Sequence, residues 1–335
     1  MKQKVTIADV AKAAGVSKQT VSRAINDKGE ISPDTKERIM LIIEQLGYRP
    51  SRLARAMNTQ RSQMVGLVVG DITNPFFPEV ARGVQDAAMD RDYNVLVCNT
   101  DDKPALATAV TESLISQGVD GIITFWNQSD KSTLLSLGDS FGPILSINTI
   151  VEHPQIDNLL VDNASGATLA VDYFVNNNHE HIGMLTNSIN QTTLVRRVQG
   201  FQQAIADHNL NPNYIVEHPA TLAGGYEAAK TLLNKYPQIS AIFTYNDLMG
   251  LGAIRACLDA GRKIPDDISI IGFDDIQLSA MYTPSLSTIR VDKYEMGRLA
   301  FERIFTRIEQ PDHHYSPLHM GVELILREST KSITT

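Results

Sequence analysis

The stretch from Val5 to Asp27 reads "VTIADVAKAAGVSKQTVSRAIND" and holds two short helical patterns with a glycine between them. Thr6, followed three residues later by Asp9, is a capping-box pattern, so a helix is expected to begin directly after Thr6. Gly15 can take the left-handed conformation that ends many helices. Ser17 then fits the cap of a second helix. The stretch therefore predicts two short helices joined by a tight turn.

A third helix is predicted between Ser32 and Gly47. Ser32 is expected to cap it, and Pro33 fits its first position, where a missing N–H costs nothing. The apolar face of this helix is expected to hold Ile39, Ile42, Ile43 and Leu46. The apolar face of the second helix is expected to hold Val21, Ala24 and Ile25. Residues 1–49 are therefore predicted to form a helix-turn-helix domain with a small core.

The polar face of the second helix carries long donors and short hydroxyls, which suit base edges and phosphates in a DNA major groove. Lys18 and Gln19, in the first turn, are expected closest to the bases. Arg23 can read guanine or hold a phosphate, and the base contact is favoured. Ser22 shares the outward face. The candidate phosphate contacts are Thr6, Ser17, Thr20 and Asn26. The alternative is a three-helix domain whose polar face is only solvated.

The charge distribution favours the DNA interpretation. The chain of 335 residues has a net charge of −8, but residues 1–62 hold 12 Lys and Arg and 6 Asp and Glu. That head is therefore net +6, and the remainder of the chain is net −14. A basic head on an acidic body indicates that the head contacts a polyanion.

Residues 50–62 are predicted to be a hinge. A short helix there would place Ala54 and Met57 on one face and Arg55 on another. So short a helix is marginal alone in water, because helix nucleation is costly. Our hypothesis is that it folds when two copies pack over a minor groove, with Met57 as the apolar wedge between base steps. The alternative is a plain linker.

From Met64 onward, apolar runs alternate with amphipathic helical patterns, which predicts α/β architecture with parallel sheets covered on both faces. Residues 65–67 are echoed by residues 182–184, and residues 83–87 by residues 200–204, each 117 positions later. We therefore expect two similar subdomains with a cleft between them. The expected subdomains are 63–161 with 292–320, and 162–291 with 321–335.

Ligands of open α/β sheets bind beyond the carboxyl ends of the strands. In this sequence those positions hold aromatic, amide, carboxylate and guanidinium side chains, which suit a polyhydroxylated small molecule. The candidate effector-binding residues are Phe76, Phe77, Trp126, Asn187, Arg197, Asn246 and Asp274. Asn246 could instead serve only as a helix cap, and Asp275 is assigned a structural role.

Several other classes of function find little support in the sequence. No run of 18 apolar residues exists, and the N-terminus turns polar too quickly for a signal peptide. Cys98 and Cys257 are expected to be buried thiols, which fits a reducing cytoplasm. Gly250 and Gly252 begin a dinucleotide fingerprint, but Arg255 stands where its third glycine belongs. No metal-binding spacing or nucleophile elbow stands out. We expect no enzyme, no cofactor and no metal.

The motifs together resemble the LacI/GalR family of bacterial transcription regulators over nearly the whole chain. They are "TIADVAKAAGVSKQTVSRAIN", "SRLARAM", "NPFF", "RxxGF" at 197–201, "YND" at 245–247 and "GFDD" at 272–275. The resemblance implies a DNA-binding head, a hinge helix, and a core similar to periplasmic sugar-binding proteins. It also implies that Arg197, Asn246 and Asp274 bind the effector, with Phe76 or Phe77 and Trp126 near its ring.

Two features depart from that family. The hinge wedge is usually leucine, whereas this chain has Met57, which is flexible and still apolar. The sequence ends in "RESTKSITT" with no heptad extension, so a dimer is expected rather than a tetramer.

The sequence thus predicts a DNA-binding transcriptional regulator, by default a repressor released from DNA by its effector. A homodimer is expected to bind a pseudo-palindromic operator under control of a sugar, sugar acid or nucleoside. Two alternatives stay open: control by a protein co-repressor, and a cytoplasmic sugar-binding protein without a DNA role.

Overall fold

The structure is a computed structural model, and it describes residues 5–25, 31–48, 61–125, 131–187, 192–311, 313 and 315–331. The chain divides into two compact units, Met1–Ser62 and Gln63–Thr335, called here the head and the core. Each unit is considered by itself. Within the described residues, no helix is both long enough and apolar enough to cross a membrane.

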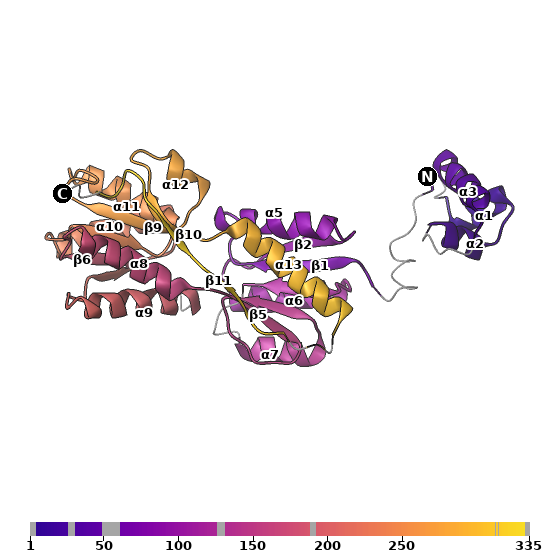
Figure 1. Ribbon diagram of the computed structural model, residues 1–335, viewed down its shortest axis with the longest axis horizontal. Helices are drawn as coiled ribbons and strands as arrows, with labels where there is room; N and C mark the ends of the chain where they lie inside the picture. The colour runs from indigo at the N-terminus through magenta and orange to yellow at the C-terminus, as the bar shows by residue number, and fades with distance from the viewer. Residues whose placement is uncertain are drawn as a thin grey trace. The chain divides into compact units, whose positions relative to one another are not determined.

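The head contains α1 (Ile7–Ala14), α2 (Lys18–Ile25) and α3 (Pro33–Leu46), as the sequence predicted (Figure 1). The Thr6 backbone N–H donates to Asp9 Oδ2 at 2.9 Å. Ser17 Oγ accepts from the Thr20 backbone N–H at 3.1 Å. Gly15 and Gly47 end α1 and α3 with φ of +65° and +62°. The predicted helix caps are therefore confirmed.

The core of the head is small and lies where the three helices meet. Its buried residues are Val10, Ala11, Ala14, Val21, Ala24 and Ile39. Ile25, Ile42 and Ile43 are partly buried against them. The expectation for Leu46 was wrong, because this side chain is 39% exposed. The 14 residues of α3 span about 21 Å and the eight of α1 or α2 only about 12 Å, so the last turn of α3 has little to pack against.

The remainder of the chain contains two six-stranded sheets of the same topology. The first, in spatial order, is β11-β5-β4-β3-β1-β2, and the second is β12-β10-β9-β8-β6-β7. The strands of the first are β1 (Met64–Val69), β2 (Asn94–Asn99), β3 (Gly121–Thr124), β4 (Ile144–Ile147), β5 (Ile156–Val161) and β11 (Leu318–Met320). The strands of the second are β6 (Ile182–Thr186), β7 (Ile215–Glu217), β8 (Ala241–Thr244), β9 (Ser269–Asp274), β10 (Ser287–Arg290) and β12 (Glu323–Ile325).

The matching topology explains the echo in the sequence. Among the named strands of the described residues, all pairings are parallel except that of β12 with β10. β1 lies between β2 and β3 just as β6 lies between β7 and β8. The repeated residues 65–67 and 182–184 thus occupy equivalent strands of the two sheets. The predicted parallel sheets of two similar halves are confirmed.

Helices cover both faces of each sheet (Figure 1). On the first sheet, α5 (Phe76–Met89) and α13 (Lys293–Glu309) lie on one face, and α6 (Pro104–Ser116) and α7 (Lys131–Ser140) on the other. On the second sheet, α8 (Asn163–Asn176) and α9 (Thr192–Asp207) lie on one face, and α10 (Leu222–Lys235) and α11 (Asp247–Asp259) on the other. The short helix α12 (Gln277–Met281) follows β9.

The chain passes between the two halves three times. It crosses from β5 to α8, from β10 to α13, and from β11 to β12. Side chains near the first two crossings, Asn163 and Lys293, make the contacts between the halves that the next sections use.

Candidate DNA-binding face and effector site

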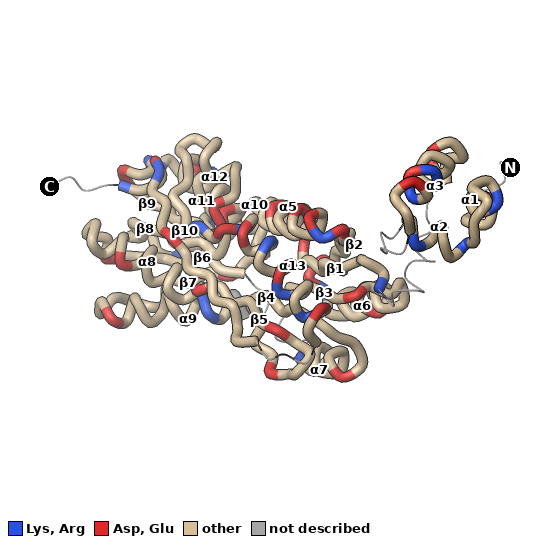
Figure 2. The backbone as a smooth tube through the Cα atoms, turned by 45° about the vertical axis from the view of Figure 1, so that its right-hand side comes forward, with Lys and Arg blue, Asp and Glu red and all other residues tan. Residues whose placement is uncertain are grey.

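The α2 helix separates its apolar and polar residues as the sequence predicted. Val21 and Ala24 are buried, while Lys18, Gln19 and Arg23 are exposed. α2 carries two basic residues and no acidic one, whereas α3 carries both signs (Figure 2). The described part of the head therefore concentrates a net positive charge on the helix whose outer face is polar.

The shorter polar side chains of the head are partly committed to its own structure. Thr6 Oγ donates to Asp9 Oδ2 at 2.8 Å, and the Ser17 and Thr20 hydroxyls lie 2.9 Å apart. Phosphate oxygens accept hydrogen bonds, so Thr6 must release Asp9 before its hydroxyl can donate to DNA. Ser22 is half-buried. Four further DNA-binding candidates lie outside the described residues: Asn26, Ala54, Arg55 and Met57.

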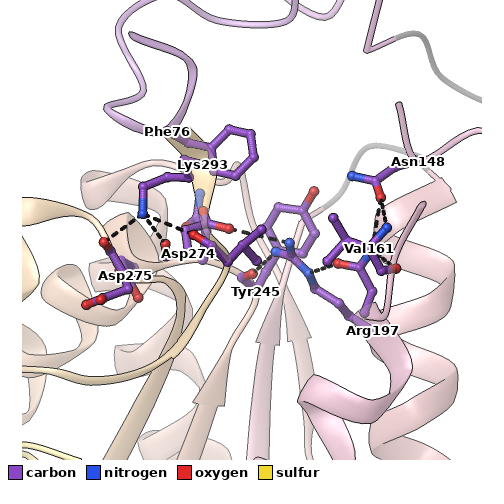
Figure 3. Close-up of polar contacts among 12 residues, drawn as sticks. Phe76, Asn148, Val161, Arg197, Tyr245, Asp274, Asp275 and Lys293 are labelled. Carbon is purple, nitrogen blue, oxygen red and sulfur yellow. Dashed lines mark hydrogen bonds and ion pairs between the residues drawn. The ribbon is translucent and has the colours of Figure 1, made fainter. Parts of the chain in front are cut away.

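Arg197, from α9, is the centre of the predicted effector site. Its Nε donates to Asn163 Oδ1 at 2.9 Å, one terminal nitrogen donates to the Tyr245 carbonyl, and the other lies 3.4 Å from Asp274 Oδ1 (Figure 3). The guanidinium carbon also lies 3.6 Å from the centre of the Phe273 ring. A buried guanidinium that bonds three partners of the second half is held in a fixed direction.

Two asparagines that the sequence analysis missed extend this network to the first sheet. Asn163 Nδ2 donates to the Val161 carbonyl at 3.1 Å and approaches Asn148 Oδ1 at 3.4 Å. Asn148 Oδ1 also accepts from the Val161 backbone N–H at 3.0 Å (Figure 3). Asn148 directly follows β4 and Asn163 lies two residues after β5. Reading the residues that follow these two strands, as was done for others, would have found both.

An aromatic cluster lies in the first half of the core and contains two of the predicted effector-binding residues. The rings of Phe76, Phe77 and Phe125 meet edge to face, with centroids 5.2–6.0 Å apart. Phe125, which directly follows β3, was not predicted. Its sequence neighbour Trp126 was predicted, but that residue lies outside the described part of the chain. The structure thus brings both predicted phenylalanines into one cluster with a third.

Asn246 and Asn187 are both buried. Asn246 caps α11: its Oδ1 accepts from the Met249 backbone N–H at 2.9 Å, and its Nδ2 donates to the Ala220 carbonyl at 3.1 Å. The cap that the sequence suggested as an alternative is therefore present. An effector contact by Asn246 would have to share or replace one of these bonds.

Two buried carboxyl groups lie close together in the second half. Burial raises the pKa of Asp274 to about 6, against the lowering influence of Arg197 and Lys293. Burial, and then the nearby charge of Asp274, raises the pKa of Asp247 to about 7. Asp247 accepts hydrogen bonds from the Ile276 backbone N–H and the Ser279 and Thr288 hydroxyls. It thereby ties the start of α12 and strand β10 to α11.

The Asp275 side chain, beside Asp274, takes no part in the Arg197 network. Its two oxygens pair with Arg290 at 2.7 Å and Arg327 at 2.5 Å. The structural role assigned to Asp275 from the sequence fits these contacts.

Within the described part of the chain, three buried hydroxyl groups without hydrogen-bond partners lie near the ends of strands. Thr124, Ser146 and Thr186 lie at or next to the ends of β3, β4 and β6, and their buried oxygens have no hydrogen-bond partner among the described residues. An unsatisfied buried hydroxyl costs free energy, so such groups favour a polar occupant nearby.

Comparison with known proteins agrees with this geometry. Residues 6–51 match the model for bacterial regulatory proteins of the lacI family, and residues 171–330 match a periplasmic binding protein-like domain. The HTH-type transcriptional repressor PurR of Haemophilus influenzae (strain PittEE) is 34% identical over 335 residues, which cover 98% of this chain and 99% of the relative. The chain belongs to the lacI family of bacterial regulatory proteins.

Other lacI-family repressors and solved structures are similar over the full length. The PurR repressor of Photobacterium profundum is 31% identical, with 98% of this chain and 99% of the relative covered. The lac repressor dimer bound to operator and the anti-inducer ONPF has a TM-score of 0.91 at 25% identity, covering 98% of this chain and all of that one. The cellobiose complex of the regulator CelR has a TM-score of 0.74 at 26% identity, covering 97% and 100%. This lacI-family chain is accordingly a DNA-binding transcriptional regulator with an effector-binding core.

Proposed function

We propose that the protein is a homodimeric repressor that binds a pseudo-palindromic operator and changes its affinity when a small polar effector occupies the core. The observation that carries the proposal is the exposed polar face of α2, where Lys18, Gln19 and Arg23 project from a helix anchored by Val21 and Ala24. Such a face fits a major groove. A function without enzymatic activity, in the cytoplasm where the DNA lies, is part of this proposal.

The test of operator binding is selection from a random duplex pool by the purified full-length chain. We expect enrichment of a pseudo-palindrome whose half-sites lie about one helical turn apart, because a two-fold dimer presents two α2 helices. Recovery of no preferred sequence, with or without candidate effectors, would contradict the proposal.

We propose Arg197 and Asp274 as polar effector contacts, with Phe76 and Phe77 covering an apolar face of the ligand. Asn187 and Asn246 are further candidates, and so is Trp126. Rings with nearby amide, carboxylate and hydroxyl groups suit a sugar, sugar acid or nucleoside. A thermal-shift screen of these three classes tests the proposal. Stabilisation by one class supports it, and no response from any class would favour control by a protein partner.

We propose that the two halves of the core move relative to each other as the effector binds. One half comprises residues 63–161 with 292–320, and the other comprises residues 162–291 with 321–335.

A homodimer is supported by apolar side chains that the single chain leaves exposed. Met281 of α12 is 74% exposed, and Leu278 of the same helix and Val97 of the edge strand β2 are exposed as well. Exposed apolar residues of this kind favour an interface with a second copy.

A further inference from the structure

Lys293 is the first residue of α13, and this helix position is unusual for a buried ammonium group. Its side chain is only 3% exposed. The first turn of a helix carries partial positive charge, so a lysine there is disfavoured. Burial of an ammonium adds a desolvation cost that only well-placed partners offset. The partners of Lys293 therefore indicate what its burial achieves.

The Lys293 ammonium joins the two halves of the core. Nζ donates to the carbonyls of Asp274 at 2.6 Å and Asp275 at 2.8 Å, both at the end of β9 in the second half (Figure 3). It also lies 3.5 Å from Glu79 Oε2, in α5 of the first half. A third carbonyl, that of Val291, lies 3.5 Å away. One cation thus links the turn that carries Asp274 to α5, the helix that carries Phe76 and Phe77.

The turn held by Lys293 has a costly backbone. Asp274 and Asp275 have φ of +109° and +53°, in a region that residues other than glycine rarely adopt. Such conformations persist only where the surroundings impose them. The two carbonyls converge on the ammonium while the Asp274 carboxylate faces Arg197 (Figure 3). Lys293 therefore fixes the direction in which Asp274 presents its carboxylate.

The other end of the link is a rigid pair of helices. A Cβ added at Gly83 of α5 would lie 2.1 Å from the Tyr294 carbonyl of α13, and one added at Gly297 of α13 would lie 2.1 Å from the Val80 carbonyl of α5. The two helices therefore touch backbone to backbone and are expected to move as one body. Glu79 lies one turn after Phe76 on this body.

We propose that Lys293 is a positioning residue that couples the Asp274–Asp275 turn to the α5–α13 pair, and through it couples the effector site to operator binding. The inference rests on the proposed function, because it explains how movement on one side of the proposed effector site is transmitted to the other side. Allosteric coupling requires such an element with different contacts in the two states. Displacement of the turn by an effector moves the α5–α13 pair only while the ammonium holds both.

The first test is amide hydrogen exchange on the full-length protein without ligand. In Lys293→Met, exchange of residues 272–278 is expected to rise about tenfold or more, because charge-assisted bonds to the Asp274 and Asp275 carbonyls are lost. Residues 79–84 of α5 should also exchange faster. Glu79→Gln, which removes only the half-exposed partner, should raise the exchange of 272–278 about threefold.

The matched control is Glu227→Gln. Glu227 of α10 is an exposed glutamate whose ion pair with Lys230, at 4.0 Å, involves neither Lys293 nor the Asp274–Asp275 turn. This variant should leave residues 272–278 unchanged. If Lys293→Met fails to fold, Lys293→Gln and Glu79→Gln give the same comparison. Unchanged exchange in the Lys293 variant, or an equal effect of Glu227→Gln, would overturn the proposal.

The second test distinguishes coupling from simple structural support. With the duplex recovered by selection, wild type should show altered exchange of residues 272–278 on DNA binding, by reciprocity of linkage. Lys293→Met should bind the same duplex but lose that response. A preserved response in the variant, or none in wild type, overturns the coupling. If selection yields no duplex, the proposed function fails, and the ligand-free exchange still decides whether Lys293 joins the two halves of the core.

Discussion

We expect the preference for a particular DNA sequence to arise from individual side chains on α2. The exposure of Lys18, Gln19 and Arg23 was predictable, because caps and apolar spacing are local properties of a helix. The locked state of Arg197 was not predictable. Its partners Asn163 and Asp274 are 34 and 77 positions away in sequence and meet it only through the folded topology.

Replacement of Gln19 by alanine tests base recognition by a single residue. We expect a loss of about 1–3 kcal/mol for the preferred duplex and a relaxed choice at one base position. Competition binding with single-base variants of the selected duplex measures both. Gln45→Ala, at an exposed glutamine of α3, is the control and should leave the preference intact. If Gln19→Ala weakened binding to every duplex equally, Gln19 would contact the DNA phosphate backbone rather than a base.

The buried carboxyl of Asp247 makes stability depend on pH. Its pKa is raised from 3.8 to about 7, so the unfolded chain gives up this proton at a lower pH than the folded chain does. The free energy of unfolding should therefore fall, relative to Asp247→Asn, as pH rises from about 4 to about 7, by about 1.4 kcal/mol for each unit of raised pKa.

Urea denaturation of both proteins across this pH range measures the difference. Asparagine is neutral at every pH, so the variant removes the titration. Its single acceptor oxygen replaces only one of the two Asp247 oxygens that accept hydrogen bonds, which lowers stability by an amount that does not vary with pH. A difference in unfolding free energy that stays constant with pH would show that Asp247 does not titrate in this window.

Among the elements, contact between helices depends on glycines that no local pattern marks as important. The α5 and α13 helices approach closely at Gly83 and Gly297. Strand and helix alternation predicted both sheets, because apolar runs and amphipathic spacing are visible in sequence. The close approach was not predictable, since it joins residues more than 200 positions apart. The role of Lys293 was not predictable for the same reason, because its partner Glu79 is also more than 200 positions away. In the sequence, Lys293 looks like an ordinary lysine at the start of a helix.

Substitution of Gly83 by alanine should separate these helices. The new Cβ would lie 2.1 Å from a backbone carbonyl, so the expected cost is about 1–3 kcal/mol of core stability. Urea denaturation reports it. Gly321→Ala is the matched control, since its Cβ meets nothing within 4 Å and its φ is not positive. Equal stability of the two variants would mean that α5 and α13 can shift apart freely.

For the whole molecule, the repeated topology was the most accessible prediction, because equal offsets of 117 residues survive in two short echoes. The way two chains meet is a property of the assembly. Met281 on α12 is the most exposed of the large apolar residues in the described chain. Replacement by aspartate would place a charge in the proposed interface.

Met281→Asp should therefore shift the protein toward monomer at micromolar concentration, as sedimentation velocity would record. Met89→Asp, at an exposed methionine of α5, compares a second apolar position. If Met281→Asp sediments as wild type does, α12 lies outside the interface. A monomeric variant should also lose most operator affinity, because only one half-site is then held.

The central claim is that the polar face of α2 reads a duplex sequence. The most direct measurement is a titration of the full-length chain with its selected duplex and with a scrambled duplex of equal length and composition, at the same salt concentration. The account predicts an affinity at least about 10³-fold higher for the selected duplex. Equal affinity for the two duplexes would contradict it.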